Sequence, residues 1–211
     1  MAIGPYLRGG WSAALCVALV TGATAAQRGR IELTPFAGGL IPTSVLGMLQ
    51  VPGNSSEPIT VEGKLKLAGA FGARLGIWVN ERWGLEAGFA HSSSDLTIAL
   101  GNLRGEIDGQ VEAGSLKTFY RVTKEGTETD FLISAGVGAV HHGGPGFRLA
   151  SAQLDPAGVA GAGLHLAMSS YATLRFDGEL FLYRWSPGSS GGSTFQSDLV
   201  VSAGLAISLN R

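Results

Sequence analysis

The sequence predicts an all-β protein: a closed, antiparallel, up-and-down transmembrane β-barrel of about eight strands, in which long loops alternate with short turns. Three observations lead to this fold class. Apolar and polar residues alternate with a period of two in segment after segment, as in strands with two unlike faces. No run of roughly 18 apolar residues follows the N-terminal segment, so no helix is expected to cross a bilayer. The connections alternate between long and short, as the two ends of such a barrel require.

The first 26 residues are expected to be a secretory signal peptide, and residues 27–211 a single barrel domain. Arg8 precedes a short apolar run at 11–20, and small residues at 23–26 offer a cleavage site before Gln27. The one cysteine, Cys16, lies in this segment, so the exported chain is expected to contain no disulfide. The net charge of −1 gives no electrostatic reason to expect a nucleic-acid partner.

Eight segments carry the alternation and are expected to be the barrel strands: 30–40, 63–79, 83–89, 111–124, 130–139, 161–168, 172–185 and 199–210. Four polar or glycine-rich stretches are expected to be long loops: 42–62, 92–110, 141–156 and 186–195. Short turns at 80–82, 125–127 and 169–171 complete the connections. Long loops and short turns thus fall at opposite ends, as in an outer-membrane barrel with its loops outside the cell and its turns in the periplasm.

Each expected strand has its own apolar face. In chain order these faces are formed by Ile31 and Leu33; by Leu65, Leu67, Phe71, Leu75, Ile77 and Val79; by Trp83, Leu85 and Phe89; by Leu116, Tyr120 and Val122; by Phe131, Ile133, Val137 and Ala139; by Leu164, Leu166 and Met168; by Leu174, Phe176, Leu180 and Leu182; and by Leu199, Val201, Leu205, Ile207 and Leu209. The opposite faces are mostly Gly, Ala and Ser with a few charges, which suits the crowded interior of a small barrel.

The charges on the small-residue faces are expected to point into the lumen and to pair there, because charges held inside must be compensated. Turning Arg175 toward lipid would cost roughly 2–4 kcal/mol near the middle of a bilayer. Trp83, Tyr120 and Phe131 lie on the apolar faces beside the short turns, where an aromatic girdle would lie. The expected lumen charges are Glu32, Arg74, Glu86, Lys117, Arg121, Asp130, Arg175, Asp177 and Glu179.

With this signal, alternation and loop pattern, residues 27–211 resemble the small eight-stranded outer-membrane barrels, that is, the OmpA-type transmembrane domain and its OmpX- and OmpW-like relatives. The resemblance implies outer-membrane lipid and the barrel-insertion machinery as partners, and an unknown extracellular partner for the loops. The lumen charges would then either line a narrow polar path or gate, or form a structural plug; the plug is the expectation, since barrels this small are filled by their own side chains. Family members commonly end in an aromatic residue, whereas this chain ends in Asn210 and Arg211, and no peptidoglycan-binding domain follows the barrel.

His91 and Ser93 lie two and four residues after Phe89, and alternate residues of a strand share a face. Both are therefore expected to face lipid, as Phe89 does, near the outer rim. This looks like the His-x-Ser portion of the outer-membrane lipid A deacylases, in which an acid orients the histidine base. Glu106 or Glu112 would serve as that acid. The match is short and lacks the asparagine that follows the serine in that family. A polar strand end leading into a loop is therefore the preferred interpretation, with no catalytic residues.

No cofactor or metal site is expected. His141 and His142 are adjacent and would point to opposite faces of a strand, so they would not bind one ion. His165 is expected to be an interior hydrogen-bonding residue. The sequence thus favours a non-enzymatic outer-membrane barrel with a structural or surface-interaction role through its four long loops, and at most a narrow lumen for small solutes. The alternatives are a lipid A acyl hydrolase and an exported soluble barrel that binds an apolar ligand.

Overall fold

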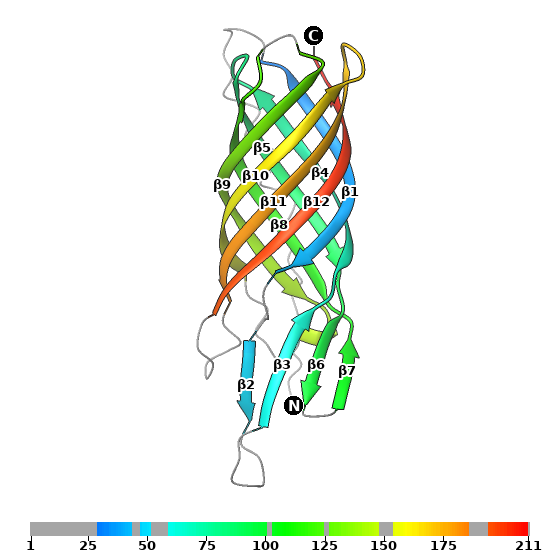
Figure 1. Ribbon diagram of the computed structural model, residues 1–211, viewed down its shortest axis with the longest axis vertical. Coiled ribbons are helices and arrows are strands. Elements are labelled where there is room, and N and C mark those ends of the chain that lie inside the picture. The colour runs from blue at the N-terminus through cyan, green and yellow to red at the C-terminus, as the bar shows by residue number, and fades with distance from the viewer. Residues whose placement is uncertain are drawn as a thin grey trace, which may run out of the picture.

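In the computed structural model, eight long strands close into an antiparallel barrel in the order β1-β12-β11-β10-β9-β8-β5-β4 (Figure 1). The structure describes residues 29–43, 47–51, 59–100, 103–124, 127–147, 154–185 and 194–210, so the expected signal peptide lies outside the described residues. The barrel strands are β1 (Ile31–Pro42), β4 (Ala68–Trp78), β5 (Trp83–Ser93), β8 (Gln110–Arg121), β9 (Thr129–Gly143), β10 (Leu154–Ala167), β11 (Ala172–Trp185) and β12 (Thr194–Ser208). The predicted fold class is confirmed. Among the described residues no helix is both long and apolar enough to cross a bilayer.

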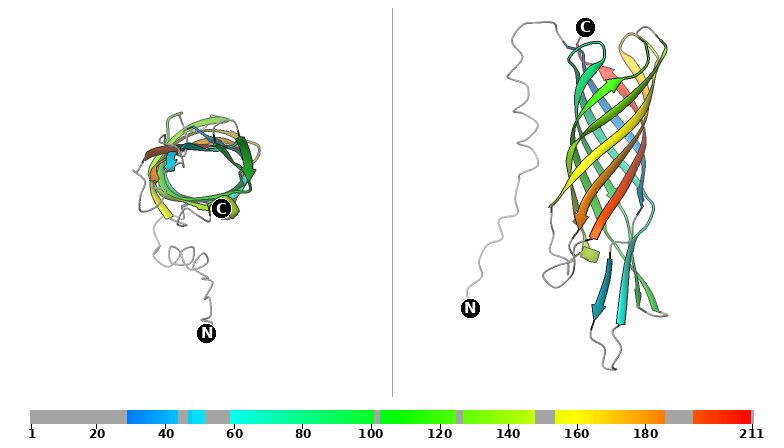
Figure 2. Two further views of the ribbon diagram at one scale, coloured as in Figure 1. Left: turned by 90° about the horizontal axis from the view of Figure 1, so that it is seen from below. Right: turned by 60° about the vertical axis from the view of Figure 1, so that its left-hand side comes forward.

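The barrel has two unlike ends. Three short connections, between β4 and β5, β8 and β9, and β10 and β11, lie at the end where β1 begins and β12 ends; we call it the turn end. The opposite end, which we call the loop end, carries the long connections. The end-on view in Figure 2 shows the wall as a closed ring, and β1 completes it by pairing with β12 on one side and β4 on the other.

Two of the predicted long loops are wrong in part, because they contain strands. Strands β2 (Gly47–Val51), β3 (Ile59–Leu65), β6 (Leu96–Leu100) and β7 (Leu103–Ile107) form a second sheet in the order β2-β3-β6-β7. This loop-end sheet projects beyond the barrel in Figure 1. Polar composition and Pro and Gly residues suggested loops here, but β2 and β3, and β6 and β7, pair as short hairpins, and β3 and β6 join the two hairpins.

The predicted strand 63–79 is interrupted at Lys66 and Leu67, where the chain passes from β3 to β4. Leu65 was therefore assigned to the wrong face: its side chain is 2% exposed, whereas Leu67 is 72% exposed. The strand predicted at 161–168 is also too short, since β10 begins at Leu154 and β9 reaches Gly143. The third predicted loop, 141–156, is correspondingly shorter than expected and begins with a 3-10 turn, η1 (Pro145–Phe147).

The predicted polarity of the wall is confirmed. On β11, Phe176 and Leu182 are exposed while Arg175, Asp177 and Glu179 are buried. The same holds around the ring, where the large exposed apolar side chains include Leu33, Phe71, Leu85, Phe89, Leu116, Ile133, Val137, Leu164, Val201 and Leu205. This apolar exterior argues against the soluble ligand-binding barrel, whose outer surface would have to be solvated.

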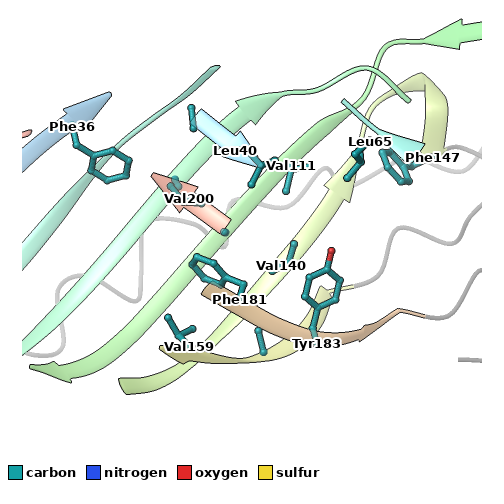
Figure 3. Close-up of a cluster of buried hydrophobic side chains, with 14 residues drawn as sticks. Phe36, Leu40, Leu65, Val111, Val140, Phe147, Val159, Phe181, Tyr183 and Val200 are labelled. Atoms are coloured by element: carbon teal, nitrogen blue, oxygen red, sulfur yellow. The ribbon is translucent and has the colours of Figure 1, made fainter. Parts of the chain in front are cut away.

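The interior is filled by two apolar clusters that lie on either side of the charges. At the turn end, Trp78, Phe119 and Leu132 pack together, with the Trp78 and Phe119 rings edge to face at 4.7 Å. A larger cluster fills the loop-end half; Figure 3 shows Leu65 and Phe147 at one end of it and Phe36 toward the other. We call these the turn-end cluster and the loop-end cluster.

Candidate functional site

Six of the nine predicted lumen charges meet in the middle of the barrel, and we call them the central cluster: Arg74, Glu86, Lys117, Arg175, Asp177 and Glu179. Three are positive and three are negative, so the cluster is electrically neutral. None of them is more than 9% exposed. A buried charge of this kind is tolerated only when it is paired and hydrogen-bonded, and the contacts described next meet that requirement.

Arg175 is held by two carboxylates. Its Nη1 lies 2.7 Å from Glu86 Oε2 and its Nε lies 3.1 Å from Asp177 Oδ2. Asp177 also receives Arg74, at 3.4 Å, and contacts His165 Nε2 at 3.3 Å. His165 therefore lies inside the barrel and contacts the carboxylate of Asp177, as expected for an interior hydrogen-bonding residue. These are charge-assisted bonds, the stronger class of hydrogen bond, and they connect β4, β5, β10 and β11 across the lumen.

Lys117 adds a fifth strand, β8, to the cluster, and Arg74 of β4 makes further contacts. Lys117 Nζ lies 3.1 Å from Glu86 Oε1 and contacts the Glu179 carboxylate. Arg74 Nη2 donates to Ser202 Oγ at 2.9 Å, and its guanidinium lies 3.9 Å from the centre of the Phe36 ring. The register explains why β5 and β8 bring opposite charges together, because Glu86 lies directly opposite Lys117.

The cluster leaves almost no open space. A cavity of about 20 Å³, lined in part by Glu86, Lys117, Arg175 and Glu179, remains beside it. That volume suffices for about one water molecule. The cavity beside the charges is thus too small for a solute much larger than water.

The other three predicted lumen charges lie apart from the central cluster, toward the turn end. Glu32 pairs with Arg30 at 2.7 Å, and Arg121 pairs with Asp130 at 3.1 Å. Trp78 lies between the two arginines, with guanidinium-to-ring distances of 5.1 Å for Arg30 and 4.5 Å for Arg121. Among the described residues these pairs form no ion pair with the central cluster, although Glu32 lines the same small cavity as Glu86 and Lys117.

A polar chain that the sequence did not single out crosses the loop-end half of the lumen. Tyr183 donates to Asp198 Oδ2 at 2.7 Å, and its hydroxyl lies 3.2 Å from His142 Nε2. On the other side of the ring, His142 Nδ1 lies 3.8 Å from Asp155 Oδ2. All four side chains are buried. The alternation of inward and outward positions along a strand would have found these residues, because each lies on the inward face of its strand. Asp155 and His142 were missed because they fall in a stretch that was assigned to a loop.

The predicted outer-rim residues are only partly brought together. His91 Nδ1 lies 3.5 Å from Glu112 Oε1, because His91 and Glu112 are register partners on β5 and β8. His141 approaches the other oxygen of Glu112 at 3.7 Å from β9. Ser93 is exposed two residues beyond His91 on the same strand. Glu106 lies elsewhere, on β7, where it pairs with Lys66 at 2.6 Å, so of the two predicted acids the structure places Glu112 beside His91.

Fold and interior together define a class: the chain has the fold of the small eight-stranded outer-membrane barrels. OprG, an outer membrane protein from Pseudomonas aeruginosa, superposes with a TM-score of 0.63 at 11% identity over 87% of this chain and 98% of that one. The outer membrane protein AlkL gives a TM-score of 0.55 at 14% identity, covering 90% and 94%. Neisserial surface protein A gives 0.53 at 10% identity, covering 88% and 99%. No family model matches the chain, and no curated protein matches it.

Proposed function

We propose that the protein is a non-enzymatic barrel of the bacterial outer membrane whose lumen is closed, and that it acts at the cell surface through its loop end. The observation that carries this proposal is the filling of the lumen at three successive levels: the turn-end cluster, the central cluster and the loop-end cluster. The central cluster has equal numbers of positive and negative charges, all of them paired, and this supports a structural plug rather than a polar path through the lumen. The apolar exterior and the similarity in fold to outer-membrane proteins support the location.

The loop-end sheet is the second support for a surface role. Short connections would suffice to join the barrel strands, yet the chain builds four additional strands between β1 and β8 on the loop-end side. A sheet that projects from the barrel presents two edge strands, β2 and β7, to its surroundings. The partner it meets would be extracellular, while outer-membrane lipid surrounds the wall.

Orientation and closure are tested separately. An epitope inserted between β6 and β7 should be reached by antibody on intact cells, whereas the same epitope placed at Glu81 in the turn between β4 and β5 should be reached only after the outer membrane is permeabilised. In planar lipid bilayers the wild-type protein should give no ohmic current steps. The opposite epitope pattern would refute the orientation, and regular current steps would refute the closed lumen.

A second candidate function rests on the contact between His91 and Glu112. A serine hydrolase needs a nucleophile, a base and a group that orients the base. Ser93, His91 and Glu112 supply these three types on the outer face, near the loop end, where a lipid acyl ester of the outer leaflet would lie. The 3.5 Å separation is longer than an ordinary hydrogen bond, as is common in catalytic sites without substrate.

Mass spectrometry of lipid A separates the two functions. If the protein is an acyl hydrolase, cells that express it should lack an acyl chain on lipid A, and Ser93→Ala or Glu112→Gln should restore the chain. Glu106→Gln is the matched control, because this acid pairs with Lys66 away from His91 and should leave the pattern of the active protein unchanged. An acyl pattern that is the same with and without the wild-type protein excludes the hydrolase and leaves the closed barrel.

A further inference from the structure

Phe147, the last residue of η1, is buried beside Leu65 at the outer limit of the loop-end cluster, and is thus placed to cover that end of the lumen (Figure 3). Gly144, which joins β9 to η1, has a φ of +90°, a conformation that favours glycine. The Phe147 amide then donates to the Gly144 carbonyl at 3.2 Å. The Phe147 side chain is only 4% exposed, and its ring lies 5.1 Å from the His142 ring within the loop-end cluster (Figure 3). The orientation of the His142 ring thus bears directly on the position of this covering residue.

The hydrogen bonds of Tyr183 determine which nitrogen of His142 carries a proton. The hydroxyl has one proton, which it donates to Asp198 at 2.7 Å. Its oxygen can therefore only accept from His142, across 3.2 Å, so Nε2 carries the hydrogen. In the neutral ring Nδ1 is then a bare lone pair.

The bare nitrogen faces a second acceptor. His142 Nδ1 and Asp155 Oδ2 lie 3.8 Å apart, both are buried, and neither has a hydrogen-bond partner within the described residues. Two lone pairs in an apolar cluster repel, and leaving both groups unpaired is costly. A single added proton, shared between them, turns the repulsion into a hydrogen bond.

We propose that His142 and Asp155 form a single-proton latch that holds Phe147 over the mouth of the lumen. Proton uptake pairs the two groups, fixes the imidazole and seats the Phe147 ring against it. Proton loss leaves the two acceptors opposed, so the His142 ring turns away and the cover loosens. The titratable groups that act on His142 are Asp155 from β10 and Tyr183 from β11, with Asp198 of β12 behind Tyr183. The neighbouring His141 of β9 also acts electrostatically on both His142 and Asp155. From β8 and η1 it meets the uncharged Val111 and Phe147.

The sign of the pH dependence follows from this linkage. The closed state binds the shared proton more tightly than the open state, so closure is most stable at low pH and weakens as the pH rises through the pKa of the latch. Opening would uncover the apolar loop-end cluster from outside, while the central cluster beneath it stays in place. The latch therefore controls access to the upper lumen and does not control passage through the barrel.

Amide hydrogen exchange at Phe147 tests the latch in the purified, folded full-length protein in lipid nanodiscs. The readout is the protection factor, which removes the intrinsic pH dependence of exchange. For the wild type it should fall about fivefold to tenfold as the pH rises from about 3 to about 8, the effect expected for one net hydrogen bond. Asp155→Asn should give high protection at all pH values, because its amide donates permanently to Nδ1. Asp155→Ala should give low protection at all pH values.

Glu106→Gln is the matched control, since this acid belongs to the loop-end sheet and pairs with Lys66, and it should keep the wild-type response. Heat-modifiable gel migration shows whether each variant is folded. If Asp155→Ala does not fold, the test of the latch rests on whether the protection factor of Asp155→Asn is independent of pH. A pH-independent wild type, or an Asp155→Asn profile equal to that of the wild type, overturns the proposal. Protection that rises with added Zn²⁺ and is lost with a chelator would also overturn it, in favour of a metal bridge.

Discussion

Arg175 is the residue on which the interior of the barrel depends most. It is 5% exposed, and its guanidinium pairs with Glu86 and Asp177, each of which also contacts another cation of the central cluster. Removing one member of a buried ion pair leaves its partner uncompensated, which costs far more than the pair contributes on balance. The central cluster is therefore a poor source of net stability and a strong source of specificity, because few other packings would leave all six charges paired.

The substitution Arg175→Met should lower the free energy of unfolding by roughly 3–5 kcal/mol, since it keeps much of the side-chain volume but leaves two carboxylates short of a cation. Urea titration in detergent, followed by gel migration without heating, measures the change. Arg184→Met is the control, because Arg184 is exposed and contacts only the Phe195 ring at 5.4 Å among its described interactions. Equal losses for the two variants would contradict the assignment of a buried plug.

Much of this interior was predictable residue by residue. Parity alone assigned all nine charges to the inner face, because a strand with one lipid-facing side tolerates no charge there. Parity could not say which charges meet, since that depends on how far each strand is displaced along its neighbour. Ser202 was missed for the same reason, because its partner Arg74 comes from another strand. Asp155 and His142 were missed because their stretch was assigned to a loop.

At the scale of the strand, glycine determines how closely neighbours approach. Gly84 of β5 lies opposite Phe119 of β8, and a Cβ there would fall within the Phe119 ring. That ring is buried against Trp78 in the turn-end cluster. The absent side chain is thus part of the packing, because it makes room for an aromatic residue that would otherwise need to leave the lumen.

Gly84→Ala should destabilise the barrel by about 1–3 kcal/mol through overpacking against Phe119. Gly114→Ala is the matched control on β8, since a Cβ at Gly114 would meet nothing within 4 Å. Thermal unfolding of both variants in the same detergent gives the comparison. If Gly84→Ala melts at or above the temperature of Gly114→Ala, the Phe119 ring can move aside without cost and the overpacking argument is contradicted.

The strand boundaries show where sequence patterns were sufficient. Strands β1, β4, β5, β8, β9, β11 and β12 follow predicted alternation, because one face of each meets an apolar surrounding. The loop-end sheet was not predicted, since it projects past the barrel and lacks the long alternating segments that lipid contact imposes. Its strands form because they pair with one another, and the sequence gives little warning of such local pairing.

For the whole molecule, the apolar exterior determines where the protein can reside. Val137 lies near the middle of β9 and is 65% exposed, whereas Leu154, 67% exposed, begins β10 at the loop end. If the exterior meets lipid, the same substitution should have very different costs at these two positions, because the cost of a charge depends on its depth in the bilayer.

Val137→Arg should cost roughly 2–4 kcal/mol when the protein folds into lipid vesicles, and Leu154→Arg should cost about 0–1 kcal/mol. Folding yield as a function of urea measures both. Similar costs at the two depths would refute the membrane orientation, even if the barrel itself were intact.

Closure by the first and last strands has a consequence for assembly. Arg74, Glu86 and Lys117 come from β4, β5 and β8 and sum to +1, whereas Arg175, Asp177 and Glu179 all come from β11 and sum to −1. A chain that stops before β11 therefore carries one uncompensated positive charge in the lumen, and its β1 edge has no β12 to pair with. Placing an uncompensated charge in a hydrocarbon surrounding is costly, so we expect the charges of the lumen to be stable in a membrane only once β11 is in place.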